Sequence, residues 1–289
     1  MGDVIGLHIM GRMSTIAATR AMPSTLTDRQ VAAYHRDGYL SGGPLLTPTE
    51  VEELRKELDR VIAERDRTDI PQPVSCMDMN RAGTPVWQIV NTWQASPAFE
   101  RLIHHPRLVA MMRQLAGADG RVLRVWHDQV QYKPAHHGGV NWWHQDSPYW
   151  TTLSPRDSMV TAWIALDEVS LDNGCMSMVP GSHSWGDHIE HLHACGERSR
   201  EFWTSLGDEF QDQPVRVVPR TVALGNVHFH HPLTWHGSHE NRSDRPRRAI
   251  AVHAMTARTV FDEKGQHIMK KFITAKHGQP VTDSVFVEL

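Results

Sequence analysis

The sequence predicts a mainly β protein: an antiparallel sandwich or jelly roll, with helices from its N-terminal third packed on one sheet. Apolar residues at helical spacing are concentrated before Gly117. From about Val122 onward, short strand-like runs alternate with Gly, Pro, Asn and Asp. The chain shows neither an internal repeat nor a low-complexity segment, so nothing in it favours a solenoid or a disordered protein.

Two helix starts carry capping boxes, in which a Thr side chain and a Glu or Gln three residues later cap each other's backbone. The pairs are Thr27 with Gln30 and Thr47 with Glu50. Gly38 is expected to end the first helix, because glycine readily adopts the left-handed conformation of a helix C-terminus.

A third helical region is expected to start at Ser96-Pro97. Pro106 interrupts it, and Gly117 occupies the position of its C-terminal cap.

The strand-like runs are rich in β-branched and aromatic residues and are bounded by turn formers. They are Val122–Trp126, Gln129–Tyr132, Ser158–Leu166, Cys175–Val179, Val215–Val218, Gly225–Phe229 and Arg248–Met255. The polar stretch after Ser184 contains no long strand-like run. Residues 185–214 are therefore a candidate lid insertion, because long loops in compact domains are usually functional.

Composition limits the classes of partner. The chain has 289 residues and a formal net charge of −3, so it lacks the basic field that nucleic-acid binding requires. It has no apolar run of membrane-spanning length, so we expect no membrane partner. The three cysteines, Cys76, Cys175 and Cys195, are widely spaced, which argues against a disulfide framework and favours a cytoplasmic location.

We expect a flexible N-terminal tail over residues 1–22 and a single domain over residues 23–289. A monomer or a homodimer is expected.

A possible metal site begins at Trp143-His144-Gln145-Asp146. On an extended segment, residues two apart point to the same face, so His144 and Asp146 can converge on one metal ion. A third ligand must come from elsewhere, and His236 is the strongest candidate. Two His and one carboxylate on one side of a metal leave three positions open.

The chain also offers competing histidines. His136-His137 is one pair, and His228 and His230 share a face of a predicted strand and could form a ligand pair. Any single histidine can instead be an ordinary surface or core residue.

Arg247 follows His236 by eleven residues and leads into a predicted strand. A planar guanidinium binds a carboxylate through two parallel hydrogen bonds. A dicarboxylate that chelates a metal at one end needs such a cation at the other, and Arg248 is the next candidate for this role.

A series of motifs follows in order across about residues 25 to 260, and the early Asp37-Gly38-Tyr39 precedes them. They are Gln131-Tyr132-Lys133-Pro134, Trp143-His144-Gln145-Asp146, Ala162-Trp163-Ile164-Ala165-Leu166, Asp172-Asn173-Gly174, Val179-Pro180-Gly181-Ser182-His183, His236-Gly237-Ser238 and Pro246-Arg247. In this order and spacing the chain resembles the phytanoyl-CoA dioxygenase family of Fe(II)/2-oxoglutarate oxygenases. The order of the whole set is far more specific than any one motif.

The resemblance implies a double-stranded β-helix, which is a jelly-roll barrel with the metal at its open mouth. It implies that Fe(II), 2-oxoglutarate and O2 take part in catalysis, and it assigns roles to individual residues. His144, Asp146 and His236 would bind Fe(II) as the catalytic centre, Arg247 and Ser238 would hold the distal carboxylate of 2-oxoglutarate, Gln131, Tyr149 and Trp163 would line the same pocket, and His183 would face the substrate.

Aromatic residues next to the ligand motif predict an apolar pocket wall that includes Trp143 and Trp150. Related halogenases replace the carboxylate ligand with a small residue, whereas Asp146 is present here. We therefore expect hydroxylation, or a related oxidation, of an aliphatic C–H bond in a small-molecule metabolite or natural product, with release of succinate and CO2.

Two other functions fit part of the pattern. A cupin-like Zn or Mn enzyme would keep the two His and the Asp but would need no carboxylate anchor. A metabolite-binding regulatory protein could share the fold without catalysis, because fold alone does not establish function. Production of succinate from 2-oxoglutarate distinguishes the oxygenase from both.

Overall fold

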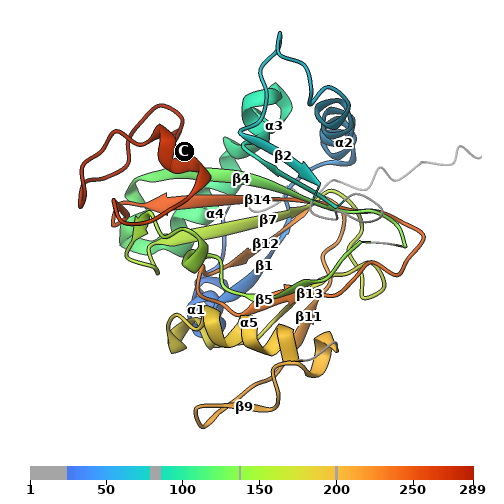
Figure 1. Ribbon diagram of the computed structural model, residues 1–289, viewed down its shortest axis with the longest axis vertical. Helices are drawn as coiled ribbons and strands as arrows, with labels where there is room; N and C mark the ends of the chain where they lie inside the picture. Colours follow the sequence, from blue (N-terminus) through green and yellow to red (C-terminus); the bar gives the residue numbers. More distant parts are fainter. Residues whose placement is uncertain (1–24, 79–85, 137, 199–200) are drawn as a thin grey trace, which may run out of the picture.

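Two antiparallel sheets of unequal size face each other in the computed structural model (Figure 1). The structure describes residues 25–78, 86–136, 138–198 and 201–289. The expected tail at residues 1–22 and His137 of the competing pair lie outside the described residues. Within them, the predicted mainly β jelly roll with N-terminal helices on one sheet is confirmed.

The sheets place sequence-distant strands side by side, as a jelly roll requires. The major sheet has the order β1-β12-β7-β14-β4-β3-β2, formed by Tyr39–Pro44, Asn226–His230, Met159–Ala165, Arg247–Thr256, Leu123–Lys133, Trp87–Val90 and Ser75–Asp78. The minor sheet has the order β11-β8-β13-β5, formed by Val218–Arg220, Met176–Met178, His236–Ser238 and Asn141–His144. Two short hairpins pair β9 (Glu209–Phe210) with β10 (Gln213–Pro214) and β6 (Leu153–Ser154) with β15 (Val260–Phe261).

The two faces of the major sheet have different surroundings because side chains alternate along each strand. In β7, Val160, Ala162 and Ile164 face the helices, whereas Trp163 and Ala165 face the interior between the sheets. Strand β14 repeats the pattern, with Ile250, Val252 and Ala254 toward the helices and Ala249 and Ala251 toward the interior.

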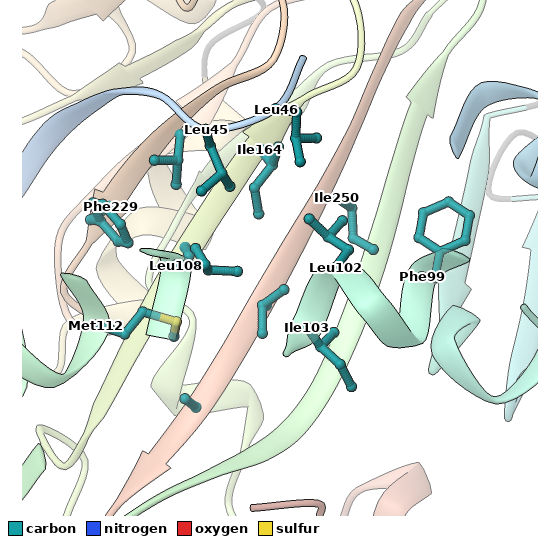
Figure 2. Packing of buried hydrophobic residues seen from close by; sticks show 14 of the residues in the cluster. Leu45, Leu46, Phe99, Leu102, Ile103, Leu108, Met112, Ile164, Phe229 and Ile250 are labelled. Carbon is teal, nitrogen blue, oxygen red and sulfur yellow. The ribbon is translucent and has the colours of Figure 1, made fainter. Parts of the chain in front are cut away.

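The helices cover the outer face of the major sheet. They are α1 (Asp28–Asp37), α2 (Pro48–Ala63), α3 (Pro97–Ile103) and α4 (Pro106–Ala116). Figure 2 shows Leu102 and Ile103 of α3 and Leu108 and Met112 of α4 directed onto the strands that carry Ile164 and Ile250. Each fully buried Leu or Ile stabilises this layer by about 1.5–3 kcal/mol.

The predicted helix ends are confirmed. Both capping boxes form, at Thr27 with Gln30 and at Thr47 with Glu50. Gly38 adopts φ 80° at the end of α1, and β1 begins at the next residue. Pro106 starts α4 and Gly117 ends it.

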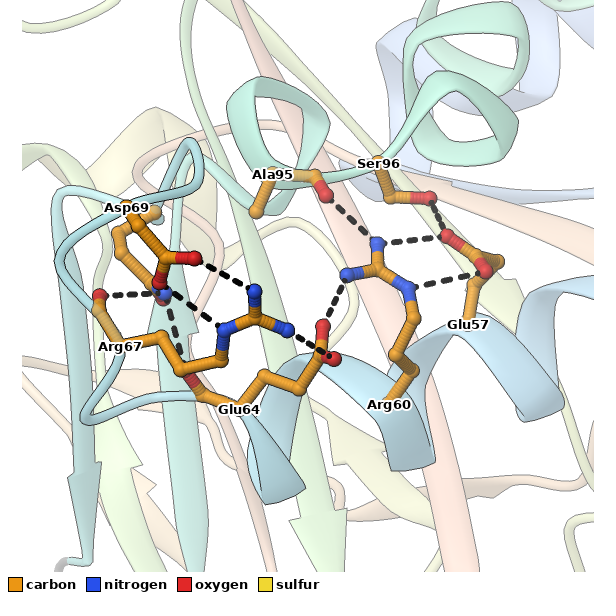
Figure 3. Close-up of polar contacts among 8 residues, drawn as sticks. Glu57, Arg60, Glu64, Arg67, Asp69, Ala95 and Ser96 are labelled. Carbon is orange, nitrogen blue, oxygen red and sulfur yellow. Dashed lines mark hydrogen bonds and ion pairs between the residues drawn. The ribbon is translucent and has the colours of Figure 1, made fainter.

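An ion-pair network joins α2 to the start of α3 (Figure 3). Arg60 binds Glu57 and Glu64 on its own helix and donates to Ala95 O at 2.7 Å. Ser96, the N-cap of α3, donates its hydroxyl to Glu57 at 2.7 Å and does not cap its own helix. These contacts fix the junction between two helices of the outer layer.

Some strands differ from the prediction. Val122–Trp126 and Gln129–Tyr132 are parts of one strand, β4, in which a bulge near Trp126 breaks the apparent pattern. The predicted run Val215–Val218 meets β11 only at its last residue. Strands β2 and β3 were not predicted, because they are short and lie within the mostly helical third.

The candidate lid at residues 185–214 is not a structureless loop. It contains α5 (Ile189–Arg198), which packs under the minor sheet beside β5 (Figure 1), and the β9–β10 hairpin. Leu192, Cys195 and Phe202 are buried against Trp143 and Trp235. The sequence of residues 185–214 is rich in polar residues because only one side of this segment is buried.

The C-terminal segment packs beside Trp126 and Trp150 and contributes Phe261, Met269 and Phe286 to a cluster at one end of the major sheet. Cys76, Cys175 and Cys195 form no disulfide with one another in the described structure. In the ranges that the structure describes, no helix has the length and apolar character needed to cross a bilayer.

Asp128 provides a test of the packing between β4 and the outer layer. Its fully buried carboxylate accepts the backbone N–H groups of Thr92 and Trp93 at 2.7 and 2.9 Å. Asp128→Ala should leave both donors unsatisfied and lower the free energy of unfolding by about 2–5 kcal/mol in urea denaturation. Asp128→Asn retains one acceptor oxygen and should cost less. An alanine variant as stable as wild type would contradict this account.

Candidate functional site

The predicted metal ligands meet at the edge of the minor sheet. His144 ends β5 and His236 begins β13, and the two residues are register partners in these neighbouring strands. Their ring centroids are 4.1 Å apart. Strand pairing therefore brings together two histidines that are far apart in sequence.

The position of Asp146 is set by the turn that follows β5. Strand β5 ends at His144, and Asp146 has helical backbone angles (φ −73°, ψ −50°) as the N-cap of the 3₁₀ helix η3 (Ser147–Tyr149). The extended strand therefore stops before Asp146, although the two side chains still point to one place as the spacing predicted. The Asp146 N–H donates to Pro232 O at 3.0 Å, which ties this turn to the chain just before His236.

The three side chains nevertheless converge. Their ligand atoms all lie within 4.8 Å of one another. Oδ1 of Asp146 is 3.8 Å from Nε2 of His144 and 3.5 Å from Nε2 of His236. This is the only such group of three metal-ligating side chains among the described residues, so the competing pair His228 and His230 is not part of a second one.

Each histidine has one ring nitrogen committed to the backbone. Nδ1 of His144 lies 2.7 Å from Trp142 O, and Nδ1 of His236 lies 2.9 Å from Thr234 O. Because a carbonyl oxygen only accepts, Nδ1 carries the proton in both rings. The lone pair on each Nε2 is then available to a metal, as in most histidine metal sites.

Electrostatics favour a cation at this point. Burial lowers the pKa of His144 to about 3, which keeps its ring neutral near pH 7. Burial alone would raise the pKa of Asp146, but His236 and His230 outweigh it and hold that pKa well below its usual value. Burial lowers the pKa of His236, and the Asp146 carboxylate more than compensates. Near pH 7 the ionised Asp146 carboxylate therefore lies next to a neutral His144 ring. The same carboxylate raises the pKa of His236, because it stabilises positive charge on that ring.

A second group of predicted residues lies around Arg247. Its side chain is fully buried, and its three guanidinium nitrogens have no hydrogen-bond partner. Its Cζ lies 5.5 Å from the centre of the Trp163 ring, and Trp163 Nε1 lies 3.4 Å from Gln131 Oε1. Burial lowers the pKa of Arg247 to about 10, so it remains a cation near neutral pH. A buried cation without an anion indicates a binding place for one.

Lys133 adjoins this group but was assigned no role from the sequence. It is the register partner of Arg247 and is buried, and its Nζ donates to the carbonyls of Ser238 and His239 at 3.2 and 2.6 Å. It thereby fixes the end of β13, where Ser238 is also buried, beside the start of β14. The sequence signal that could have identified Lys133 was a charged side chain at a position of β4 that faces the interior.

The structure separates the two candidate anchors. Arg248 points to the other side of β14 and binds Asp167 through Nε and Nη2, both at 2.9 Å. Its backbone N–H also donates to Asp167, and Arg55 of α2 binds the same carboxylate. Arg248 is therefore committed to a structural ion pair, whereas Arg247 is free to bind a ligand.

Tyr149 and Trp150 follow the ligand motif directly. Tyr149 is 47% exposed, its ring lies 6.2 Å from that of His144, and its hydroxyl is 2.7 Å from His193 Nε2 on α5. Trp150 is buried, with its ring 4.7 Å from that of His253. Tyr149 thus lies at the solvent-facing side of the metal ligands, and Trp150 lies deeper.

Two predicted substrate residues lie elsewhere. Trp143 is fully buried on the opposite side of β5 from His144, where it stacks on Phe202 and donates to its carbonyl. His183 lies against the end of α1, with Nε2 3.1 Å from His35 O and its ring beside His231. Substrate contact by either residue stays a prediction.

Comparison with known proteins gives a consistent family. The sequence pattern of the family described as phytanoyl-CoA dioxygenase (PhyH) matches residues 34–249. Phytanoyl-CoA dioxygenase domain-containing protein 1 of Mus musculus is 32% identical over 161 residues, which cover 56% of this chain and 54% of that protein. Ectoine dioxygenase of Nocardia farcinica is 29% identical over 156 residues, covering 53% and 50%. The chain thus spans about half the length of these curated relatives.

Solved structures match over more of the chain. The carbocyclase SnoK from nogalamycin biosynthesis, described as non-heme and alpha-ketoglutarate dependent, superposes with a TM-score of 0.70 at 27% identity and covers 91% of this chain and 96% of its own. The epimerase SnoN, solved in complex with Fe3+, alpha-ketoglutarate and nogalamycin RO, gives a TM-score of 0.71 at 26% identity, covering 90% and 97%.

The two neighbouring arginines should respond oppositely to the same substitution. Arg247→Met removes an unpaired buried charge and should leave the ligand-free protein as stable as wild type or more stable, by up to about 4 kcal/mol. Arg248→Met breaks the pair with Asp167 and should lower the free energy of unfolding by about 1.5–3 kcal/mol. Urea denaturation of the two variants measures both effects, and a greater loss for Arg247→Met than for Arg248→Met would refute the assignment.

Proposed function

The chain belongs to the phytanoyl-CoA dioxygenase family, and from this premise and the site geometry we propose that it is an Fe(II)- and 2-oxoglutarate-dependent oxygenase. We propose that it hydroxylates, or otherwise oxidises, an aliphatic C–H bond of a small-molecule metabolite or natural product. Succinate and CO2 are the products of the co-substrate.

One observation carries this proposal: three side chains that could hold a metal ion and a buried, unpartnered Arg247 occur in the same molecule, on the two sheets that enclose one interior. Two histidines and one carboxylate leave positions open on a metal, and the donor set suits iron. A cupin-like Zn or Mn enzyme would use the ligands but not the arginine. A pure binding protein would use the arginine but not the open metal positions.

The ligand set fits Fe(II) through Nε2 of His144, Nε2 of His236 and Oδ1 of Asp146. Bound Fe(II) would supply the activation of O2, with one oxygen atom passing to succinate and the other to the oxidised C–H position. The protein's own part is to bind, orient and exclude water.

Arg247 would hold the distal carboxylate of 2-oxoglutarate, with Ser238 beside it. Trp163 and Gln131, which contact each other next to Arg247, would form the wall of the same pocket. A planar guanidinium buried among apolar groups binds a carboxylate strongly because water does not compete. The fixed anchor would orient the co-substrate before chemistry.

Tyr149 and Trp150 would contribute to the approach to the metal, with Tyr149 on the solvent side. The hydroxyl of Tyr149 meets His193 of α5, so residues 185–214 would close one side of this approach. SnoK and SnoN are named as a carbocyclase and an epimerase, which supports the inclusion of oxidations other than hydroxylation.

The proposal is tested by incubating the protein with Fe(II), ascorbate and 2-oxoglutarate under air and measuring succinate, with and without a panel of candidate metabolites. We expect slow succinate formation alone and faster formation with a true substrate. Omission of O2 should abolish it. A protein that binds 2-oxoglutarate but never forms succinate would favour the binding-protein alternative.

Asp146→Ala should abolish succinate formation and weaken Fe(II) binding, because two histidines alone hold iron poorly. Fe(II) titration under anaerobic conditions and the succinate assay measure the two effects. Wild-type turnover in this variant would show that Asp146 is not a ligand.

Arg247→Met should raise the apparent KM for 2-oxoglutarate, because loss of a buried charge-assisted pair costs roughly 2–5 kcal/mol. Arg248→Met is the matched control and should change this KM little. An unchanged KM in Arg247→Met would place the anchor at another residue.

A further inference from the structure

A row of polar side chains crosses the inner face of the major sheet. His230 of β12, Thr161 of β7 and His253 of β14 are register partners in adjacent strands, and His127 of β4 extends the row. All four side chains are buried, with exposed fractions of 4% or less. Burying polar groups is unfavourable unless they are hydrogen-bonded, so such a row calls for a specific role.

The row meets the second oxygen of Asp146. His230 Nε2 lies 2.9 Å from Oδ2, and Thr161 Oγ1 lies 3.5 Å from the same atom. Thr161 is itself held by His253 Nδ1 at 2.9 Å. The other oxygen, Oδ1, faces Nε2 of His144 and His236. The two oxygens of one carboxylate therefore have separate surroundings.

Asp146 needs an external support more than the two histidines do. Each histidine ring is fixed by its strand and by an Nδ1–H bond to a backbone carbonyl. Asp146 lies past the end of β5 on a turn, where strand geometry does not aim its side chain. His230 lies at a normal hydrogen-bond length of 2.9 Å from the Asp146 carboxylate, whereas Thr161 lies at 3.5 Å.

We propose that His230 is the positioning residue for the metal-binding carboxylate. It donates from Nε2 to Oδ2 of Asp146 and so leaves Oδ1 as the one oxygen offered to the metal. Because Oδ2 accepts the hydrogen bond from His230, Asp146 binds the metal through Oδ1 alone. A coordination position that Oδ2 would otherwise occupy on the metal therefore stays open. The inference rests on the metal centre of the proposed function and concerns no other part of it.

The sequence offers a matched control on the same strand. His228 precedes His230 by two residues, faces the same interior and is equally buried. Neither of its ring nitrogens has a hydrogen-bond partner, so it does not hold the Asp146 carboxylate as His230 does. Substituting either histidine with leucine removes the same ring from the same face.

Co(II) binding to the full-length protein without 2-oxoglutarate provides the test, through calorimetry and the visible absorption of the bound ion. His230→Leu should weaken Co(II) binding by about 10- to 100-fold, as for other residues that orient a metal ligand. It should also change the absorption spectrum, since the carboxylate geometry changes. His228→Leu should leave affinity within about threefold of wild type. His230→Gln retains a donor near the position of Nε2 and should restore most of the affinity and the wild-type spectrum.

Equal affinity in wild type and His230→Leu overturns the positioning role, as does an equal loss in His228→Leu. Thermal unfolding without metal checks that the variants fold. If His230→Leu does not fold, His230→Asn takes its place, because the shorter asparagine amide does not reach Oδ2 of Asp146. Weaker Co(II) binding by His230→Asn than by His230→Gln then supports the positioning role, and equal binding overturns it. Failure of the wild-type protein to bind Co(II) at all would instead contradict the metal centre itself.

Discussion

The alternation of side chains along β7, β12 and β14 is the constraint on which the rest of the molecule depends. Every second residue of these strands faces the helices, and apart from Arg248 at the start of β14 and Thr256 at its end the buried ones among them form an apolar cluster. The residues between them face the interior and include Trp163, His230 and Arg247. A shift of one residue in strand register would move both sets to the wrong side, so the apolar helix layer fixes the chemistry of the interior.

The two halves of the site are built by different means. The histidines are aimed by the pairing of β5 with β13, which is a property of the backbone. Asp146 is placed by a turn and aimed by side chains from the facing sheet. The hydrogen bond from His230 to Asp146 therefore connects the ligand group of the minor sheet to the major sheet.

Most of the fold could be predicted from local patterns. Capping boxes fixed the starts of α1 and α2, and β-branched runs located β7, β12 and β14 within a residue or two. Short strands such as β2 and β3 escaped prediction because tertiary pairing, and not local preference, makes them strands. The bulge in β4 interrupts its alternation, so one strand read as two.

For the site, sequence spacing brought the right residues together. It did not show that β5 ends at His144 and that Asp146 begins a turn. The sequence ranked Arg247 above Arg248 as the anchor but could not supply the structural difference between them, which is that Asp167 pairs with Arg248. His230 looked like a competing ligand, since no sequence pattern separates a residue that binds a metal from one that holds its ligand.

The carboxylate of Asp167 has an effect that extends beyond its own ion pairs. It accepts from Arg55 on the outer helix α2 and from both the backbone and side chain of Arg248, the residue next to Arg247. One carboxylate thereby joins helix α2 of the outer layer to the start of β14. Substitution of the half-buried Arg55 would consequently remove one of the two arginines that neutralise Asp167, so a residue of the helix layer contributes to the ion pairing beside the strand that carries Arg247.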